Sequence, residues 1–435
     1  MRTALQIVTV ALCLPWIVPA SAAAQGLSDQ MSDLFVRSLV LATTPGGVGV
    51  VAHTPVFADD PIVLATTGLV RQVSEQIGAE ISNIPLGTSA GGFTYTYDAA
   101  LGVFNRSTES FGPAFAERAV TQGRGRFSFG MNYLHSRYDS LDGKDLDNGE
   151  IKFNLLHQPL TPPSFVEGDV IQAALDLGLT TDTAVFFVNY GITNRFDLGL
   201  ALPVVRVDMD LTYHATILDF ATRTVSPNTH VFATGAKTQD FTAQGSASGI
   251  GDIVVRGKYA LTGGTGGGVA VGVDLRLPTG DETNMLGSGE TQARFLLIAS
   301  APVRGMVSPH VNIGYTAASG EVKDQFNYVG GIEVVPSPRI TVVADVLGRS
   351  VRDTFKTIDR STPHTFRQGP TAPVESTTLE GIAFESGTLN SVLGTAGVKV
   401  NPWRSLLISA HFLFPINDAG LRSRVTPVIG FDYAF

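Results

Sequence analysis

Apolar and polar side chains alternate along short segments from residue 127 to the end of the chain. In one segment Ile253 and Val255 fall on one face, while Arg256 and Lys258 fall on the other. A period of two belongs to a β-strand, since a helix would spread these charges across its apolar face. The alternation predicts strands at residues 127–138, 150–158, 171–179, 184–192, 196–213, 253–261, 269–277, 291–300, 310–316, 326–335, 340–349, 389–400, 406–414 and 426–435.

The last of these segments ends the chain on an aromatic residue. Five of its residues share one face: Pro427, Ile429, Phe431, Tyr433 and Phe435. An apolar alternating strand with a terminal phenylalanine resembles the C-terminal signal by which outer-membrane barrels are recognised for insertion. We therefore predict that Phe431, Tyr433 and Phe435 form a barrel-assembly signal and that the barrel-assembly machinery is a partner.

The connections between the strands alternate in length. Short ones are predicted at residues 193–194, 262–268, 336–339 and 401–405, and long polar ones at residues 214–249, 279–289, 317–325 and 350–387. Transmembrane barrels have short periplasmic turns and long extracellular loops. The predicted fold class is thus all-β, a transmembrane antiparallel up-and-down β-barrel of about 14 strands, within a range of 12 to 16. Two interfacial aromatic girdles are expected, Tyr190, Tyr259 and Trp403 near the short turns and Tyr138, Tyr213, Tyr315 and Tyr328 near the long loops.

Composition agrees with a wall that faces lipid. Charged residues make up only 16% of the chain and hydrophobic residues 44%, with 47 glycines, which is unusually apolar for a soluble exported protein. No apolar run after the N-terminal segment is long enough for a helical span of roughly 20 residues. The formal net charge of −9 argues against nucleic acid as a partner, because phosphate binding needs a basic surface.

The N-terminal residues have the pattern of an export signal. A single positive charge, Arg2, precedes an apolar run that Pro15 and Pro19 interrupt, and small residues follow up to Ala24. The alternative, a membrane anchor, is disfavoured because the run is too short and broken. A signal peptide is predicted at residues 1–24, with Gln25 as the mature N-terminus, and a bacterial outer-membrane location follows.

Residues 25–123 lack the alternation. Leu69, Val73, Ile77 and Ile81 recur at helical spacing, and a second short apolar face includes Met31. This segment is predicted to be a helix and loop plug inside or beneath the barrel, or a periplasmic segment, and residues 124–435 are predicted to be the barrel.

Six short stretches carry a family resemblance that covers roughly residue 91 to the C-terminus. They are SFGPAFAERA at residues 110–119, YGITNRFDLG at 190–199, SGIGD at 248–252, LRLPTGD at 275–281, NPW at 401–403 and LFPINDAGL at 413–421. Together they resemble the outer-membrane transporters grouped under the MetA-pathway of phenol degradation. A more distant likeness, in strand number and plug alone, is to outer-membrane fatty-acid and aromatic-hydrocarbon channels. The resemblance implies a barrel and a small apolar or aromatic cargo.

Charged residues on the inward faces are the candidate lumen-lining residues. Both signs occur among them, so they would form either a salt-bridged network that holds barrel and plug together or a mixed-charge constriction that orients a polar head group. The candidates are Asp252, Arg256, Lys258, Asp274, Arg276, Arg294, Glu333, Asp345, Arg349, Lys399, Arg422 and Arg424.

The sequence gives less support for a catalytic or metal-binding site than for a channel. His310, His411 and Ser409 fall near the lumen face, but isolated strand histidines are usually ordinary lumen residues, and we predict no enzyme, cofactor or metal. The predicted function is an outer-membrane channel for passive uptake of small, largely apolar molecules, aromatic ones among them. The alternative is a non-conducting structural or adhesive barrel that binds partners through its long loops. Outer-membrane lipid is expected around the wall.

Overall fold

Twelve antiparallel strands close into a barrel. The computed structural model describes residues 26–37, 41–42, 61–83, 85, 92–98, 103–106, 108–156, 169–220, 231–263, 267–301, 306–320, 322–367 and 372–435, so the predicted signal peptide at residues 1–24 lies outside the described residues. The ring closes because β8 pairs with both β4 and β9. In ring order the strands are β9 (Phe196–Leu218), β12 (Ile253–Gly263), β13 (Gly268–Leu277), β14 (Gln292–Ser300), β15 (Val307–Ala318), β16 (Gln325–Ser337), β17 (Ile340–Arg367), β18 (Val374–Trp403), β19 (Leu406–Pro415), β21 (Thr426–Ala434), β4 (Phe127–Tyr138) and β8 (Val170–Gly191).

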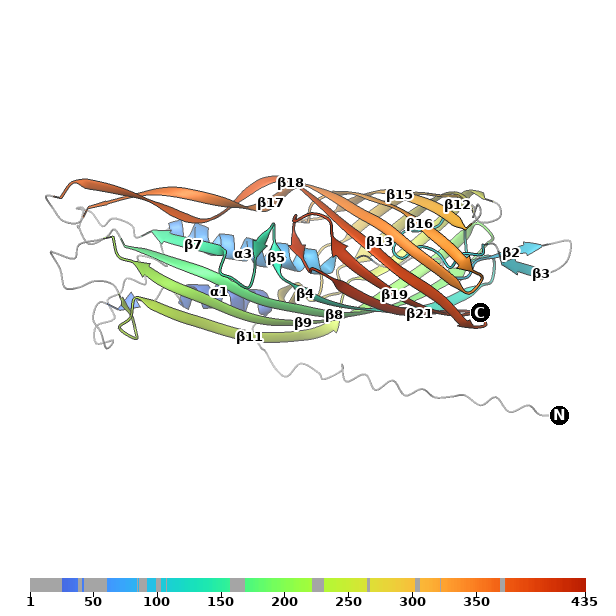
Figure 1. The fold of residues 1–435 in the computed structure, drawn as a ribbon, viewed down its shortest axis with the longest axis horizontal. Coiled ribbons are helices and arrows are strands. Elements are labelled where there is room, and N and C mark those ends of the chain that lie inside the picture. The colour runs from blue at the N-terminus through green and yellow to red at the C-terminus, as the bar shows by residue number, and fades with distance from the viewer. Residues whose placement is uncertain are drawn as a thin grey trace, which may run out of the picture.

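Two further strands extend one side of the barrel beyond the ring. β7 (Ile151–Leu156) pairs with residues 170–175 of β8, whereas β4 pairs with residues 179–190 of that strand. In the same way β11 (Thr238–Ile250) pairs with residues 204–216 of β9, whereas β12 pairs with residues 196–201. The strands β17 and β18 also continue past their outer neighbours as a long hairpin. Figure 1 shows these extensions at one end of the molecule, opposite the end that holds the C-terminus.

The predicted antiparallel barrel is confirmed, and three details of the prediction are wrong. The segments predicted at residues 171–179 and 184–192 form one strand, β8, and the loop predicted at residues 214–249 contains β11. These two errors cancel in the count, since the complete sheet has fourteen strands. The loop predicted at residues 350–387 is largely the β17–β18 hairpin, which therefore stands as paired strands instead of irregular chain.

The outer face of the ring carries an apolar belt. On β13, the outward side chains of Val271, Val273 and Leu275 are 39%, 44% and 39% exposed. Such a broad apolar surface is stable only against lipid. On β8 and β9 the outward positions become charged at Asp182 and Arg206, and beyond them the outer surface is polar. The belt therefore ends near these two residues, and the extension lies outside it.

The girdle prediction needs one correction. Tyr190, Tyr259 and Trp403 are exposed near the short turns, as are Tyr315 and Tyr328 nearer the other end. Tyr138 and Tyr213 instead point inward and are 7% and 0% exposed. Both lie on strands that continue past the belt, where the inward face packs against helices.

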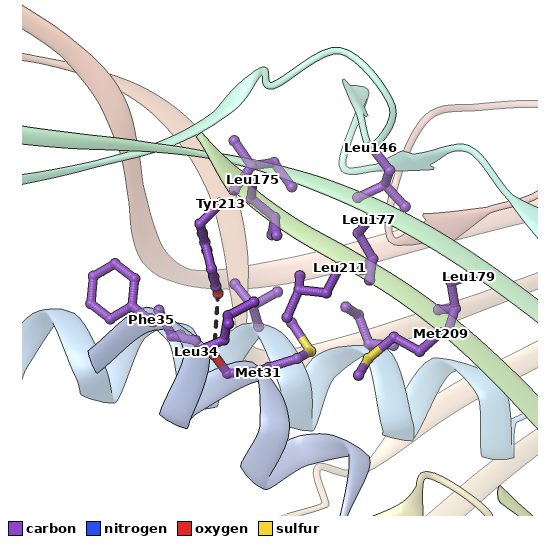
Figure 2. Close-up of a cluster of buried hydrophobic side chains, with 14 of the residues drawn as sticks. Met31, Leu34, Phe35, Leu146, Leu175, Leu177, Leu179, Met209, Leu211 and Tyr213 are labelled. Carbon is purple, nitrogen blue, oxygen red and sulfur yellow. Dashed lines mark hydrogen bonds between the residues drawn. The ribbon is translucent and has the colours of Figure 1, made fainter. Parts of the chain in front are cut away.

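Two helices fill the space that the extension encloses. α1 (Leu27–Arg37) and α3 (Pro61–Ser82) pack against each other and against the inward faces of β7, β8 and β9. Figure 2 shows Met31, Leu34 and Phe35 of α1 meeting leucines of β8 and β9, with the Tyr213 hydroxyl donating to the Met31 carbonyl at 3.5 Å. Within the described residues, no helix has the length and apolar character needed to cross a membrane.

Small elements complete the fold. The hairpin of β2 (Tyr95–Asp98) and β3 (Val103–Arg106) lies at the end of the barrel that holds the C-terminus (Figure 1). The remaining pieces are β1 (Leu41–Ala42), which pairs with β10 (Val231–Phe232), the three-stranded group of β20 (Leu421–Arg422), β5 (Ser140–Leu141) and β6 (Lys144–Asp145), and the short helix η1 (Glu282–Asn284).

Candidate lumen site

Residues 108–123, here called the plug segment, lie inside the barrel between the β2–β3 hairpin and β4. Their backbone is held by polar side chains that point inward from four separate strands. The acceptors are Thr341 for the Phe111 N–H (3.1 Å), Asp345 for the N–H groups of Ala114 and Phe115 (both 3.1 Å), Asn312 for Glu117 (2.6 Å), Ser300 for Ala119 (3.1 Å) and Asp197 for Gln122 (2.8 Å). This pattern explains how a segment without regular structure satisfies its backbone in a buried place.

A chain of ion pairs fastens the plug segment to β12, β13 and β14. Glu117 pairs with Arg256 and also with Lys258, whose Nζ lies 3.4 Å from the Glu117 carboxylate. Arg256 binds Asp274 through two nitrogens at 2.5 and 2.8 Å, and the Arg294 Nε binds Asp274 at 3.0 Å. All but Arg294 are nearly inaccessible to solvent, so each charge depends on its partner.

A second polar group holds the other side of the plug segment. The Lys399 ammonium donates to the Pro113 carbonyl at 2.6 Å. His310 lies between two carboxylates, with Nε2 at 2.7 Å from Asp345 and Nδ1 at 3.6 Å from Glu333. Asp345 therefore has two tasks, because its other oxygen accepts the plug N–H groups. The arrangement immobilises His310, which gives it the character of a structural residue.

Arg118 braces the plug segment from within. It is 2% exposed, and its guanidinium donates to the Thr108 hydroxyl at 2.9 Å and to the Ser110 carbonyl at 3.2 Å. Gly112 has a φ of +84°, and a Cβ there would meet Arg118 Nε at 3.1 Å. Glycine is therefore required at this turn by both its backbone conformation and the space that Arg118 occupies.

The structure divides the twelve predicted residues into three groups. The seven around the plug segment are Arg256, Lys258, Asp274, Arg294, Glu333, Asp345 and Lys399. Four residues lie further toward the helices. Two of them contact α3, since Arg276 donates to the Ser82 carbonyl at its end and Arg349 pairs with Glu80. The other two are Asp252, which accepts hydrogen bonds from Ser288 and Gly280, and Arg422, which donates to the Ser391 hydroxyl.

Arg424 departs from the expectation. Its side chain is 86% exposed and pairs with Asp139 at 3.2 Å, outside the buried groups. The reason is that the predicted inward alternation does not extend to residue 424, since β20 ends at Arg422 and β21 begins at Thr426.

Sequence reasoning missed the residues that the plug segment itself contributes. Glu117 and Arg118 were noted only within a family motif, and Asn312 and Asp197 were not singled out. One signal was available, because Glu117 and Arg118 are the only charged residues between Ser110 and Gly123. An adjacent pair of opposite charges in an apolar stretch predicts buried partners.

The lumen wall has two unlike sides. The inward faces of β12 to β16 carry most of the charged and amide side chains described above. The inward faces of β17, β19, β21, β4 and β8 also carry polar residues such as Asp345 and His411, but between these they bring together a cluster of apolar residues, namely Val343, Leu413, Val428, Leu134 and Val185, with Leu347 and Leu393 beside them. We call these the polar arc and the apolar arc.

A cavity of about 170 Å³ lies between the end of α3 and the barrel wall. Leu134, Leu393 and Leu413 of the apolar arc form one side of it, and Arg294 and Arg349 approach from the other. A neighbouring cavity of about 70 Å³ shares Arg294 and Arg349 and is lined mainly by the polar arc. The interior therefore contains open space where the two arcs meet.

The closed antiparallel ring and its apolar belt define a β-barrel protein of the bacterial outer membrane. A sequence profile of the family described as the MetA-pathway of phenol degradation matches residues 163–328, so the resemblance drawn from the sequence is confirmed over that region. No curated protein matches the chain in sequence.

Solved structures give more distant likenesses. An outer-membrane channel from Pseudomonas putida F1 is 11% identical with a TM-score of 0.43, and the match covers 73% of this chain and 98% of that one. A FadL homologue from Pseudomonas aeruginosa is 9% identical with a TM-score of 0.32, covering 72% and 90%. The toluene transporter TbuX of Ralstonia pickettii is 12% identical with a TM-score of 0.26, covering 72% and 90%. None is close enough to transfer a cargo to this chain.

Proposed function

We propose that this protein is a passive outer-membrane channel for small, largely apolar molecules, including single aromatic rings. The observation that carries the proposal is the apolar arc beside an unfilled cavity of about 170 Å³. An engineered cavity of about 150 Å³ lined by apolar side chains stays dry and binds benzene. Leucines on one side of a space of this size give an apolar ring a surface to pack against, while polar side chains line the other side.

The proposed route runs from the helix-filled extension to the end that holds the short turns. The extension faces the exterior, because long elements of outer-membrane barrels are extracellular. The plug segment lies across this route and is held by hydrogen bonds and ion pairs without a covalent link. Passage therefore requires that the helices α1 and α3 leave a path beside them and that part of the plug segment leaves its acceptors on the wall.

The density of those contacts favours one rival, a barrel that does not conduct. Five wall side chains accept hydrogen bonds from the plug backbone, and Glu117 pairs with two buried cations. This arrangement also suits a permanent closure. In that case the long hairpin would bind partners at the surface. The two functions differ in whether the plug segment moves.

Uptake by intact cells separates them. Initial rates for labelled phenol and toluene would be compared in cells with the gene, without it, and with an Ala119→Cys/Ser300→Cys pair. The Ala119 N–H and Ser300 hydroxyl are 3.1 Å apart, so a disulfide there would fix the plug segment to β14. We expect uptake with the gene, loss of uptake in the oxidised pair and recovery on reduction. Equal rates with and without the gene would refute the channel.

A further inference from the structure

The larger cavity contains an arginine without an acidic partner. The Arg422 guanidinium donates to three neutral oxygens, the Ser391 hydroxyl at 2.5 Å and the Leu421 and Asn417 carbonyls at 3.1 and 3.4 Å. Among the described residues, no carboxylate lies within 4 Å of it, although Arg422 is only 5% exposed. The nearby Arg349 differs, because it is neutralised by Glu80.

The two adjoining cavities together carry an excess of positive charge. Four arginines line them, Arg276, Arg294, Arg349 and Arg422, against two carboxylates, Glu80 and Asp274. Glu80 forms an ion pair with Arg349, and Asp274 forms one with Arg294. Arg276 donates to the Ser82 carbonyl at the end of α3. Among the side chains that line the two cavities this leaves an excess of two positive charges, and the carboxylates of Asp252, near Arg276, and of Asp142 and Asp418, near Arg422, reduce it without pairing directly with Arg422.

A buried guanidinium with only neutral acceptors is a binding determinant for an anion. Its planar fork matches a carboxylate, which accepts two parallel hydrogen bonds, and such charge-assisted bonds are stronger than those to neutral oxygens. The apolar side of the same cavity, formed by Leu134, Leu393 and Leu413, excludes a ligand that is charged all over. The ligand must therefore carry its charge at one end.

The volume limits the apolar end. A space of about 170 Å³ is slightly larger than the cavity of about 150 Å³ that holds benzene, so it has room for one ring.

We infer that this cavity is a binding site for a single-ring aromatic monocarboxylate, with the carboxylate on Arg422 and the ring against Leu134, Leu393 and Leu413. The inference rests on the proposed function in one respect, since the acid would be a cargo held in transit. Because Arg422 is in the loop between β19 and β21 and the leucines are on the barrel wall, the site depends on the loop folding inward against β5.

Binding to the purified full-length barrel in detergent tests the site. Isothermal titration would compare benzoate with benzyl alcohol, which has the ring without the charge, and with acetate, which has the charge without the ring. We expect benzoate to bind at least tenfold more tightly than either. Arg422→Gln should remove at least tenfold of the benzoate affinity and leave benzyl alcohol nearly unchanged. Arg424→Gln, in the same loop but on the surface, is the matched control and should behave as the wild type.

A second variant guards against failure of Arg422→Gln to fold. Ser391→Asp supplies Arg422 with an internal carboxylate where the serine hydroxyl now accepts, so it should fold and lower benzoate affinity at least tenfold. Benzoate affinity equal to that of benzyl alcohol, or unchanged in both variants, would overturn the site. The channel fails separately: benzoate binding without gene-dependent uptake of phenol in cells would keep the site and refute the channel.

Discussion

An arginine at Val273 would place a charge in the middle of the apolar belt. Val273 is the central outward residue of β13 and is 44% exposed. An arginine at the bilayer midplane of a barrel costs about 2–4 kcal/mol, whereas one near the interface costs about 0–1 kcal/mol. Val269 is the matched control, because it has the same side chain on the same strand and face. It lies four residues nearer the short turn, about 13 Å along the strand.

The expected difference between Val273→Arg and Val269→Arg is about 2–3 kcal/mol, which corresponds to about 30-fold to 150-fold in the folding equilibrium. Urea unfolding of the refolded barrel in phospholipid vesicles, read by the heat-sensitive migration of the folded form, measures it. Equal stabilities of the two variants would refute the assignment of this face to lipid. Asp274 is unsuitable as the control because it binds both Arg256 and Arg294.

Three further outcomes are expected. Glu117→Gln leaves two buried cations without their common carboxylate and should lower stability by about 3–5 kcal/mol in the same unfolding assay, so an unchanged midpoint would contradict the plug contacts. Phe435→Asp should reduce the amount of barrel in outer-membrane fractions, whereas Ile416→Asp, exposed in a loop, should not; equal amounts would remove the assembly signal. A membrane-impermeant maleimide on intact cells should label Ser376→Cys in the long hairpin and spare Arg195→Cys in a short turn, and the reverse would invert the orientation.

The barrel wall was predictable because lipid imposes a strict rule on the sequence. Every outward residue in the belt must be apolar, while the inward ones are free to be polar. The sequence around Val273 and Asp274 therefore shows which residues face lipid and which face the lumen. Outside the belt the rule no longer applies. Apart from Phe241 and Ile250, residues 238–250 of β11 are polar or small on both faces, which is why the sequence predicts a loop where this strand lies.

The lumen site was only partly predictable. Alternation identified inward charges such as Arg256 and Lys258, since their neighbours are plainly outward. It could not identify their partner, because Glu117 lies in a segment without periodic pattern and 139 residues away from Arg256 along the chain. Contacts between the plug segment and the barrel wall depend on the position of the plug segment in the folded protein, and the local sequence pattern does not determine that position. The same reason explains why the position of Arg424 was wrong.

The helices lie in a part of the protein that water surrounds, whereas the ring of strands is surrounded by lipid. The hydrophobic cluster of α1, α3 and the inward faces of β8 and β9 lies beyond Asp182 and Arg206, which mark the end of the apolar belt. Water surrounds that cluster, so the ordinary hydrophobic effect holds it, with its temperature and urea dependence. The ring of strands is surrounded by lipid instead of water. Moving its apolar side chains out of lipid into protein contacts does not stabilise it by the hydrophobic effect. Heating or urea would therefore melt the helical part first, at a temperature insensitive to the lipid used, while the ring persists.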